Sequence, residues 1–391
     1  MKRLLVVITG LGVGGAETQV VALAKGLQAR GWGIHVVSLT PPGSLAEELQ
    51  RSGIPVISLE MHRRIPQPQP VARLACFIRS WRPHVVHAHM FHANILTRLA
   101  RPLAPVPVLL CTAHSTYEAS TRAKTLKEIT WRERAYRLTD PLCDLTTQIS
   151  QAGLQRYIAV RAVPSQKIRL VHNGIDTGRF QPNAVDRQCI RTEHRLEGTF
   201  LWLAVGRLEV QKDYPTLLRA FAQLDRSGSA LWVAGEGSLR ADLESLSRSL
   251  HLADRVRFLG QRGDIPALMN AADAFVLSSA WEGFGLVIAE ALACKLPVVV
   301  TDSGGPREVV DNGRVGFLVP PRDPDALAQA MVRLMDLPEA ERRRMGELGR
   351  EYVEANYSLD RVVDQWEALY TELLERNGIR PRRMAFRGRR E

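Results

Sequence analysis

The sequence is poor in cysteine and lacks a long apolar run. Its five cysteines are scattered and include no C-x-x-C pair; they are Cys76, Cys111, Cys143, Cys189 and Cys294. An odd number of dispersed cysteines argues against a disulfide framework or a zinc cluster and favours free thiols in a reducing cytosol. No stretch reaches the ~18 uncharged apolar residues that a membrane span needs. We therefore expect a cytoplasmic protein.

The chain has 391 residues, too many for a single hydrophobic core, so two domains of ordinary size are expected. The apolar share of 45% and the charged share of 24% are typical of a globular protein. The opening segment, MKRLLVVITG, joins two basic residues to an apolar run, as a signal peptide does. Because that run is short and glycines follow it, a buried first β-strand is the better interpretation.

Short β-branched runs alternate with helical patterns along the chain, as in parallel sheets covered by helices on both faces. The predicted strands are 3–9, 34–39, 55–59, 84–88, 107–112, 144–149 and 168–171 in the first half, and 200–205, 230–234, 256–259, 274–278, 297–301 and 317–319 in the second. Two such series predict an α/β fold with two doubly wound domains.

The domain boundary is expected in the Gly-, Asn- and Pro-rich segment 172–183. We assign residues 1–178 to the first domain and 184–355 to the second. A helical pattern at 358–376 and a basic tail at 380–391 follow. The proline-spaced segment 63–73 is expected to form an extended loop.

The first candidate site is GLGVGGAE, residues 10–17, between the first strand and a helical pattern. Its glycines fit G-x-G-x-x-G, a turn that lets backbone N–H groups approach a phosphate at a helix N-terminus. A dinucleotide site would also need an acid at the end of the second strand. After that strand, the first acidic residue is Glu47. A ligand-approaching turn and mere close packing of helix on strand remain equally open.

The second candidate is GRLEVQKDYP, residues 206–215, at the carboxyl end of a strand. Doubly wound sheets bind their ligands at this edge. Arg207 and Lys212 could grip a diphosphate there, the arginine through its planar fork and the lysine as a point charge. Taken alone, the stretch is explained better as a solvated loop with ordinary surface charges.

The third candidate is WEGFGLVIAEAL, residues 281–292. Its two glycines permit a sharp turn, and a helix is expected from Leu286 with free N–H groups that can face an anion. Glu290 lies in an apolar context, where a carboxylate needs partners such as the paired hydroxyls of a ribose. Glu282 could serve a sugar ring in the same way. Helix capping or pairing with arginines is the alternative, and we favour binding.

Two further features have weaker signals. TDSGGPREVV, residues 301–310, predicts a Gly-Gly turn and a helix that begins near Pro306. His114 follows another predicted strand, where a histidine favours ligand contact.

Metal binding is not expected. His87, His89 and His92 lie close in sequence, but no acids or cysteines accompany them. The D-x-D pattern at 323–325 directly precedes a helical pattern, so helix N-capping explains it better than a metal site.

Taken together, these residues resemble the retaining glycosyltransferases of family 4, which have the GT-B fold. Glu282 and Glu290 fit the E-x7-E signature of that family. The resemblance spans nearly the whole chain and also covers GGAE at 14–17, His114, NGID at 173–176, GRL with Lys212 at 206–212, FLG at 258–260 and GGPRE at 304–308.

The resemblance implies two Rossmann-like domains that face each other across a cleft. The second would hold a nucleotide sugar, the first most of the acceptor, and the helix at 358–376 would cross back onto the first. It implies that Glu290 binds the ribose hydroxyls and that Glu282 and His114 contact the donor sugar.

Arg207 and Lys212 would, by the same resemblance, stabilise the diphosphate. Phe258 would lie beside the base through its backbone. The remaining donor-site candidates are Gly14, Gly15, Gly283, Phe284, Gly285, Leu286 and Val287.

The activity that the resemblance implies is transfer of a hexosyl or N-acetylhexosaminyl group with retention of the anomeric configuration. Cations and helix N-termini would offset the charge of the leaving group, so no metal or other cofactor is expected. We expect a UDP-linked donor. The expected acceptor is a glycan or polyprenyl-linked saccharide in bacterial surface polysaccharide or lipopolysaccharide assembly.

The net charge of +11 is concentrated at 120–140 and in the tail at 380–391. The first of these segments interleaves six Lys or Arg residues with Trp131 and Tyr136, which favours docking on an anionic membrane surface and hence a peripheral position on the inner face of the cell membrane. A solvated charged helix explains the segment equally well.

Two rival functions follow from the same sequence. A basic nucleic-acid-binding protein is disfavoured because no RNP, KH or zinc motif accompanies the basic residues. A nearer rival is a sugar-nucleotide epimerase, hydrolase or phosphorylase on the same fold.

Overall fold

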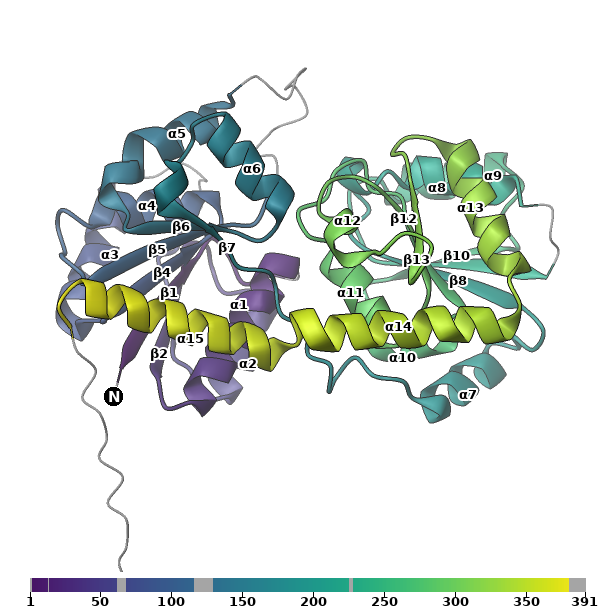
Figure 1. Ribbon diagram of the computed structural model, residues 1–391, viewed down its shortest axis with the longest axis horizontal. Coiled ribbons are helices and arrows are strands. Elements are labelled where there is room, and N and C mark those ends of the chain that lie inside the picture. Colours follow the sequence, from purple (N-terminus) through teal and green to yellow (C-terminus); the bar gives the residue numbers. More distant parts are fainter. Residues whose placement is uncertain (1, 13, 62–67, 116–128, 225–227, 380–391) are drawn as a thin grey trace, which may run out of the picture.

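The computed structural model describes residues 2–12, 14–61, 68–115, 129–224 and 228–379. They form two sheets of parallel strands. The sheets lie side by side, and each is covered by helices (Figure 1). Every strand predicted above is present, and the opening segment forms β1 (Arg3–Ile8). The basic tail lies outside the described residues.

The first sheet has seven strands in the order β3-β2-β1-β4-β5-β6-β7, with every pairing parallel. Its central strands are fully buried, because helices cover both faces. The strand bounds are β1 Arg3–Ile8, β2 Gly33–Ser38, β3 Val56–Ser58, β4 Val85–His89, β5 Val108–Ala113, β6 Leu145–Gln148 and β7 Ile168–Leu170.

The second sheet has six strands in the order β10-β9-β8-β11-β12-β13, again all parallel. The strand bounds are β8 Phe200–Val205, β9 Ser229–Ala234, β10 Val256–Gly260, β11 Ala274–Leu277, β12 Val298–Thr301 and β13 Gly316–Val319.

Helices connect most successive strands and pack their apolar faces onto the sheets. Those of the first half are α1 Gly15–Ala29, α2 Ser44–Arg51, α3 Pro68–Trp81, α4 Phe91–Ala100, α5 Trp131–Thr139 and α6 Gln151–Ala159. Those of the second half are α7 Ala184–Glu193, α8 Tyr214–Ala222, α9 Arg240–Ser249, α10 Ile265–Ala271, α11 Leu286–Ala293, α12 Pro306–Val309, α13 Pro324–Asp336, α14 Glu339–Tyr357 and α15 Leu359–Arg376. Short 3-10 turns occur at Asp140–Leu142, Ser165–Lys167 and Val210–Lys212.

One sequence expectation is wrong. The segment 63–73 was expected to be an extended loop, but α3 begins at Pro68 and runs through its second half. Prolines are tolerated in the first turn of a helix because N–H groups there have no intrahelical acceptor. Residues 62–67 lie outside the described residues.

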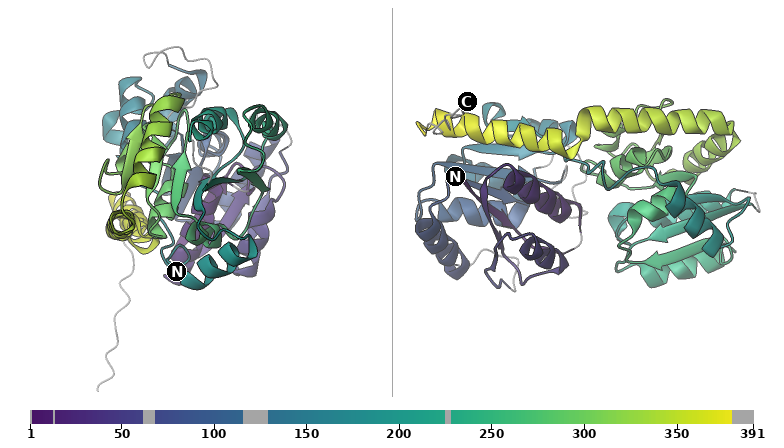
Figure 2. Two further views of the ribbon diagram at one scale, coloured as in Figure 1. Left: turned by 90° about the vertical axis from the view of Figure 1, so that its right-hand side faces the viewer. Right: turned by 90° about the horizontal axis from the view of Figure 1, so that it is seen from below.

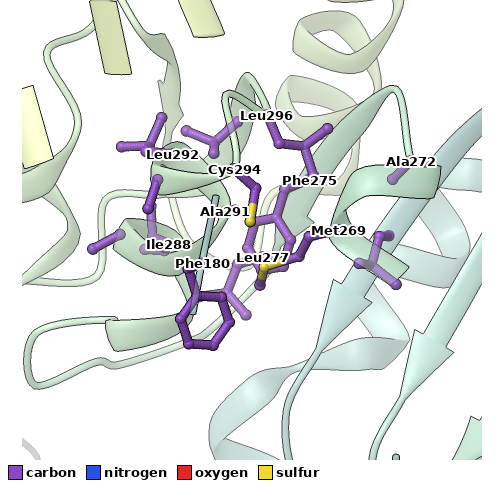
Figure 3. Close-up of a cluster of buried hydrophobic side chains, with 14 of the residues drawn as sticks. Phe180, Met269, Ala272, Phe275, Leu277, Ile288, Ala291, Leu292, Cys294 and Leu296 are labelled. Atoms are coloured by element: carbon purple, nitrogen blue, oxygen red, sulfur yellow. The ribbon is translucent and has the colours of Figure 1, made fainter. Parts of the chain in front are cut away.

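The second domain is held by a core between β11 and α11 (Figure 3). One side of α11 is buried against strand residues such as Phe275 and Leu277. Phe180, from the segment that enters the domain, packs into the same cluster. This packing fixes the rotation of α11 and therefore the direction in which its more exposed side points.

The last helix returns to the first domain. α14 lies along the second domain and α15 lies along the first, and only Ser358 separates the two helices (Figures 1 and 2). Val362, Trp366 and Tyr370 of α15 belong to the same buried cluster as the inner side of α1. The predicted terminal helix is therefore part of the first domain's core.

Candidate functional site

In each sheet the order of the strands reverses once, at a topological switch point. The candidate residues follow the strands on either side of these switch points. In the second sheet the reversal lies between β8 and β11, and in the first it lies between β1 and β4. Ligands of open α/β sheets bind outside the carboxyl ends of the strands at such switch points. Lys212 follows β8, Glu282 follows β11, and Gly14 and Gly15 follow β1.

Lys212 and Glu282 form an ion pair that bridges the switch point of the second sheet. The Nζ atom of Lys212 lies 2.6 Å from Oε2 of Glu282, and the two side chains are only 13% and 12% exposed. Ser279 donates to the same carboxylate oxygen at 3.1 Å, and the N–H of Gly283 donates to the other at 3.3 Å. A carboxylate with this many partners is held in one orientation.

The sequence indicated each of these two residues but not their pairing. Lys212 lies at the end of a 3-10 turn, where its carbonyl accepts from Ser278 Oγ at 2.8 Å. The next residue, Asp213, is left-handed with φ 46°, which turns the chain sharply into α8. This turn directs Lys212 toward Glu282.

The main chain around Glu282 is fixed to the Gly-Gly turn predicted at 304–305. The N–H of Glu282 donates to the carbonyl of Ser303 at 3.1 Å, and Glu282 forms an isolated bridge with Gly304. α11 then begins after Gly285, whose φ of 83° is left-handed and favours glycine. The predicted turn and helix start are both present.

Glu290 lies one turn into α11 on its half-buried side. Burial raises the pKa of its carboxyl group to about 7, and the positive charge of Arg179 opposes that rise. The same negative charge, after burial, helps raise the pKa of Cys294 to about 12. A carboxyl with a pKa this high changes charge near neutral pH.

The beginning of α1 meets the donor-site candidates of the second domain. A Cβ placed on Gly15 would lie 3.0 Å from Cδ1 of Leu286, so the two helix N-termini are in contact. Burial raises the pKa of Glu17, and the charge of Arg207 from the other domain opposes this rise. Arg207 is exposed and thus brings a positive charge to the domain interface.

His114 follows β5 and lies against the loop that carries Glu282. A Cβ on Gly283 would lie 2.8 Å from the carbonyl oxygen of His114. The Nε2 atom of His114 is 3.0 Å from Nδ1 of His89. Burial lowers the pKa of His114 to about 4, so its imidazole is neutral at physiological pH.

His89 and His114 both line a small cavity of about 20 Å³, together with residues such as Gln19 and Asn173. Nε2 of His89 and Nδ1 of His114 are buried and have no hydrogen-bond partner among the described residues. These two nitrogens are therefore available to a polar group inside that cavity.

Phe258 lies in β10, where the pairing with β9 is irregular. Its carbonyl accepts a hydrogen bond from Arg240 at 3.4 Å. Phe284 and Gly285 are buried, whereas Leu286 and Val287 are partly exposed at the start of α11.

Among the described residues, no group of three or more His, Cys, Asp or Glu side chains is arranged to hold a metal ion. Asp323 caps α13 by accepting from the N–H of Ala326 at 2.9 Å, as expected. His87 is buried and hydrogen bonds to two hydroxyl groups, those of Tyr370 and Thr112, each at 2.6 Å.

Comparison with known families matches both halves of the chain. Residues 13–179 match the family described as Glycosyltransferase Family 4, and residues 186–352 match Glycosyl transferases group 1. The chain belongs to glycosyltransferase family 4. The two parallel-stranded α/β sheets are those of the GT-B fold.

Two curated relatives cover most of this glycosyltransferase. The UDP-Gal:alpha-D-GlcNAc-diphosphoundecaprenol alpha-1,3-galactosyltransferase of Escherichia coli is 29% identical over 299 residues, which are 74% of this chain and 76% of the relative. Putative glycosyltransferase EpsD of Bacillus subtilis is 28% identical over 366 residues, 90% of this chain and 92% of the relative.

Solved structures share the fold. Anabaena HepE in complex with UDP matches with a TM-score of 0.81 and 23% identity, covering 95% of this chain and all of that one. Sucrose-phosphate synthase from Thermosynechococcus elongatus matches with a TM-score of 0.82 and 25% identity, covering 96% and 100%. No helix in the described part of the glycosyltransferase is long and apolar enough to cross a membrane.

Sequence reasoning missed three contributors to the site. His89 was considered only as a metal ligand, but it contacts His114. Gln19 lines the cavity and holds the backbone of Gly174 through two hydrogen bonds. Glu308 reaches from one domain to the other. Each acts through a partner distant in sequence, so no local pattern could indicate it.

Proposed function

We propose that this glycosyltransferase transfers a sugar from a UDP-sugar, with retention of the anomeric configuration, to a lipid-linked saccharide used in bacterial surface polysaccharide assembly. The UDP donor is supported by HepE, whose structure contains UDP, and by the E. coli relative, which is named for UDP-Gal. The acceptor class is supported by the diphosphoundecaprenol in that relative's name.

The observation that carries this proposal is the largely buried ion pair of Lys212 and Glu282 at the switch point of the second sheet. An ammonium group has three N–H donors, and Glu282 uses one of them. The other donors of Lys212 can face the diphosphate of a bound donor. Because Glu282 fixes the ammonium beforehand, little reorganisation is needed when charge develops on the leaving group.

The diphosphate would lie where the two domains meet. Arg207 supplies a second positive charge from the second domain, and the N-terminus of α1 at Gly14 and Gly15 faces it from the first. The N-terminus of α11 contacts α1 through Leu286. Free N–H groups of helix N-termini and fixed cations together form an anion site that needs no metal.

Glu290 is assigned to the ribose hydroxyls. Its raised pKa shows that burial outweighs the stabilisation that Arg179 gives to the ionised carboxylate. Two hydroxyl donors would stabilise the carboxylate and lower that pKa. The backbone of Phe258 is assigned to the base.

The donor sugar would lie between Glu282 and His114. The neutral imidazole of His114 can contact a sugar hydroxyl without adding charge beside the positive anomeric carbon. No side chain here is assigned as a nucleophile. The leaving phosphate would accept the acceptor's proton while the acceptor oxygen attacks the same face of the sugar.

The acceptor proposal includes membrane docking through the first domain. Residues 120–128 of the basic segment lie outside the described residues, but α5 contains most of its second half. Trp131 and Leu138 are 62% and 79% exposed there, and Arg134 and Arg137 are exposed beside them. Exposed apolar side chains among arginines fit the interface of an anionic bilayer. Failure to sediment with phosphatidylglycerol vesicles at low salt would contradict docking.

A panel of UDP-, GDP- and ADP-sugars tests the donor by the shift of the unfolding temperature. The expected result is stabilisation by UDP-sugars alone, followed by mass-spectrometric detection of a glycosylated undecaprenyl-diphosphate saccharide. An NMR assay should show an α-linked product from an α-linked donor, and a β-linked product would contradict retention.

An epimerase or hydrolase on the same fold is the alternative. Such an enzyme would release free sugar or UDP at full rate without an acceptor. Acceptor-dependent release of UDP therefore separates the two functions.

A further inference from the structure

The chain crosses between the domains twice, and the crossings hydrogen bond to each other. The N–H of Ile175, in the segment after β7, donates to the carbonyl of Tyr357 at 2.7 Å, and the N–H of Leu359 donates to the carbonyl of Ile175 at 2.8 Å. Gln19 of α1 accepts from the N–H of Gly174 at 2.7 Å and donates to its carbonyl at 2.6 Å. These two crossing segments, around Ile175 and Ser358, form the hinge between the domains, and Gln19 fixes the hinge to the first domain. Contacts away from the hinge then set how closely the second domain approaches the first.

Glu308 makes such a contact. It lies on α12 in the second domain, and its carboxylate accepts from the backbone N–H groups of Gln151 at 2.9 Å and Ala152 at 3.3 Å. These residues are the first two of α6, in the first domain. Oε2 of Glu308 also lies 3.0 Å from Nε2 of His172, and the side chain is 13% exposed. A carboxylate at a helix N-terminus is favoured by unpaired N–H groups and by the helix dipole.

The main chain of Glu308 is held in place by hydrogen bonds within the second domain. Its carbonyl accepts hydrogen bonds from the hydroxyl groups of Tyr352 at 3.0 Å and Tyr357 at 2.7 Å. Both tyrosines belong to α14, which runs to the hinge. The side chain therefore reaches the first domain from a position fixed in the second.

α12 is also packed against the loop that carries Glu282. A Cβ on Gly305 would lie 2.1 Å from the carbonyl oxygen of Gly283, so the backbones of the two turns touch. The ring of Phe284 lies 5.6 Å from that of His172, the partner of Glu308, measured between centroids. Any shift of α12 is therefore passed to this loop.

We propose that Glu308 is a positioning residue: an interdomain latch that holds the donor loop, residues 282–285, against the backbone of His114. The carboxylate of Glu308 thereby helps to set the distance between the Glu282 side and the His114 side of the site. Only the kinetic test below rests on the proposed function, because the distance test needs no substrate.

Two native cysteines provide the distance test. Cys76 in α3 and Cys189 in α7 are exposed, one in each domain, and the other three cysteines are buried. Double electron–electron resonance between spin labels on this pair measures the distance between the two domains. Glu308→Ala should broaden the Cys76–Cys189 distance distribution relative to the natural protein. Glu308→Gln, which keeps the shape and one acceptor oxygen, should give an intermediate width.

Arg307→Ala is the matched control. Arg307 is the neighbour of Glu308 on α12, but its side chain pairs with Asp302 of the same domain and is 62% exposed. This variant should leave the distribution unchanged. An unchanged distribution in both Glu308 variants, with folding confirmed by circular dichroism, would overturn the latch.

Kinetics with a UDP-sugar give the second readout. Glu308→Ala should lower kcat by about tenfold while changing KM for the donor little, because no contact with the donor is removed. Glu308→Gln should recover part of that loss. Equal kcat in Glu308→Ala and Arg307→Ala would contradict the proposal. If the natural protein transfers no sugar from any UDP-sugar, the proposed function fails, and the distance measurement still decides the latch.

Discussion

The central strands of the second sheet are apolar except for Thr301 at the end of β12, whereas those of the first sheet contain several buried polar side chains. In the second, Phe275–Leu277 and Val298–Val300 contribute only hydrocarbon to the core. In the first, His87, Thr112 and Thr147 are buried at the same depth in neighbouring strands. Both sheets have the same doubly wound topology. The difference in buried polar side chains therefore reflects the contacts that each sheet makes and not its topology.

These three polar side chains of the first sheet form one hydrogen-bonded network with Tyr370. The hydroxyl of Tyr370 in α15 lies 2.6 Å from Nδ1 of His87, and Nε2 of His87 lies 2.6 Å from Oγ1 of Thr112. That oxygen is 2.7 Å from Oγ1 of Thr147. The network ties the sheet to the returning helix. The candidate ionisable groups of the second domain instead lie in loops and at helix starts at the sheet's carboxyl edge, over an apolar scaffold.

Lys212→Ala removes the cation of that edge and should have the largest effect. Loss of one prearranged donor at a developing charge costs ~3 kcal/mol, so turnover should fall about a hundredfold. Steady-state kinetics with a UDP-sugar measure it. Lys25→Ala is the control, since Lys25 forms an exposed ion pair with Glu48 in the first domain, and its turnover should be unchanged. A fall of less than about threefold in Lys212→Ala would remove Lys212 from the site.

Glu290→Gln should weaken UDP binding about tenfold above pH 7, because a carboxylate accepts hydroxyl hydrogen bonds more strongly than an amide does. In the natural protein, UDP affinity should rise as pH increases through about 7, where the carboxyl ionises. Titration calorimetry at several pH values should show this rise in the natural protein and not in the variant. A rise of the same size in both proteins would mean that another group is responsible.

The buried histidines of the first domain and Glu290 of the second should respond to acid with opposite signs. Burial lowers the pKa values of His87 and His89 well below 6.5 and that of His114 to about 4. Their unfolded forms bind protons first as pH falls below 6.5, so the first domain loses stability down to the folded pKa values. Glu290 has a raised pKa, so its contribution is complete below 4.5 and is lost as pH rises through about 7.

Hydrogen exchange between pH 6.5 and 4.5 measures this difference. Exchange rates are first corrected for the slower intrinsic exchange of amides at lower pH. The protection of amides in β4 and β5 should then fall as pH falls, whereas that of amides in β11 should not. A larger loss of protection in β11 than in β4 would contradict the assignment of acid sensitivity to the buried histidines.

Chelation should have the smallest effect. If fixed cations and helix N-termini offset the leaving-group charge, dialysis against EDTA should leave the rate of sugar transfer within about twofold of its starting value. Assay with and without added Mg²⁺ checks this. A large loss that Mg²⁺ restores would replace the metal-free account of the donor site.

The sequence was sufficient for the sheets, because each buried strand is a short β-branched run between turn residues. It also located the turn at Gly285 and the start of α11, since only glycine adopts that backbone at little cost. It did not indicate α14 as a separate helix. Nor did it indicate the burial of His87, whose cost is offset by a hydroxyl 283 positions away in the chain.

The candidate site divides in the same way. Lys212 and Glu282 were each indicated by their place after a strand, but their ion pair depends on two loops that meet only in the folded protein. Glu308 was visible only as part of a Gly-Gly turn motif. Its contact with α6 depends on how the two domains are oriented, which no local pattern encodes.

Because α15 returns to the first domain, it also determines which of the two domains can complete its core first. The first domain leaves the ribosome first, yet Trp366 and Tyr370 fill its core, and Lys2 hydrogen bonds to Thr371, 369 positions later in the chain. The second domain has all its strands before α15 is translated. The half that is synthesised first is consequently completed last, because its core lacks Trp366 and Tyr370 until α15 has emerged.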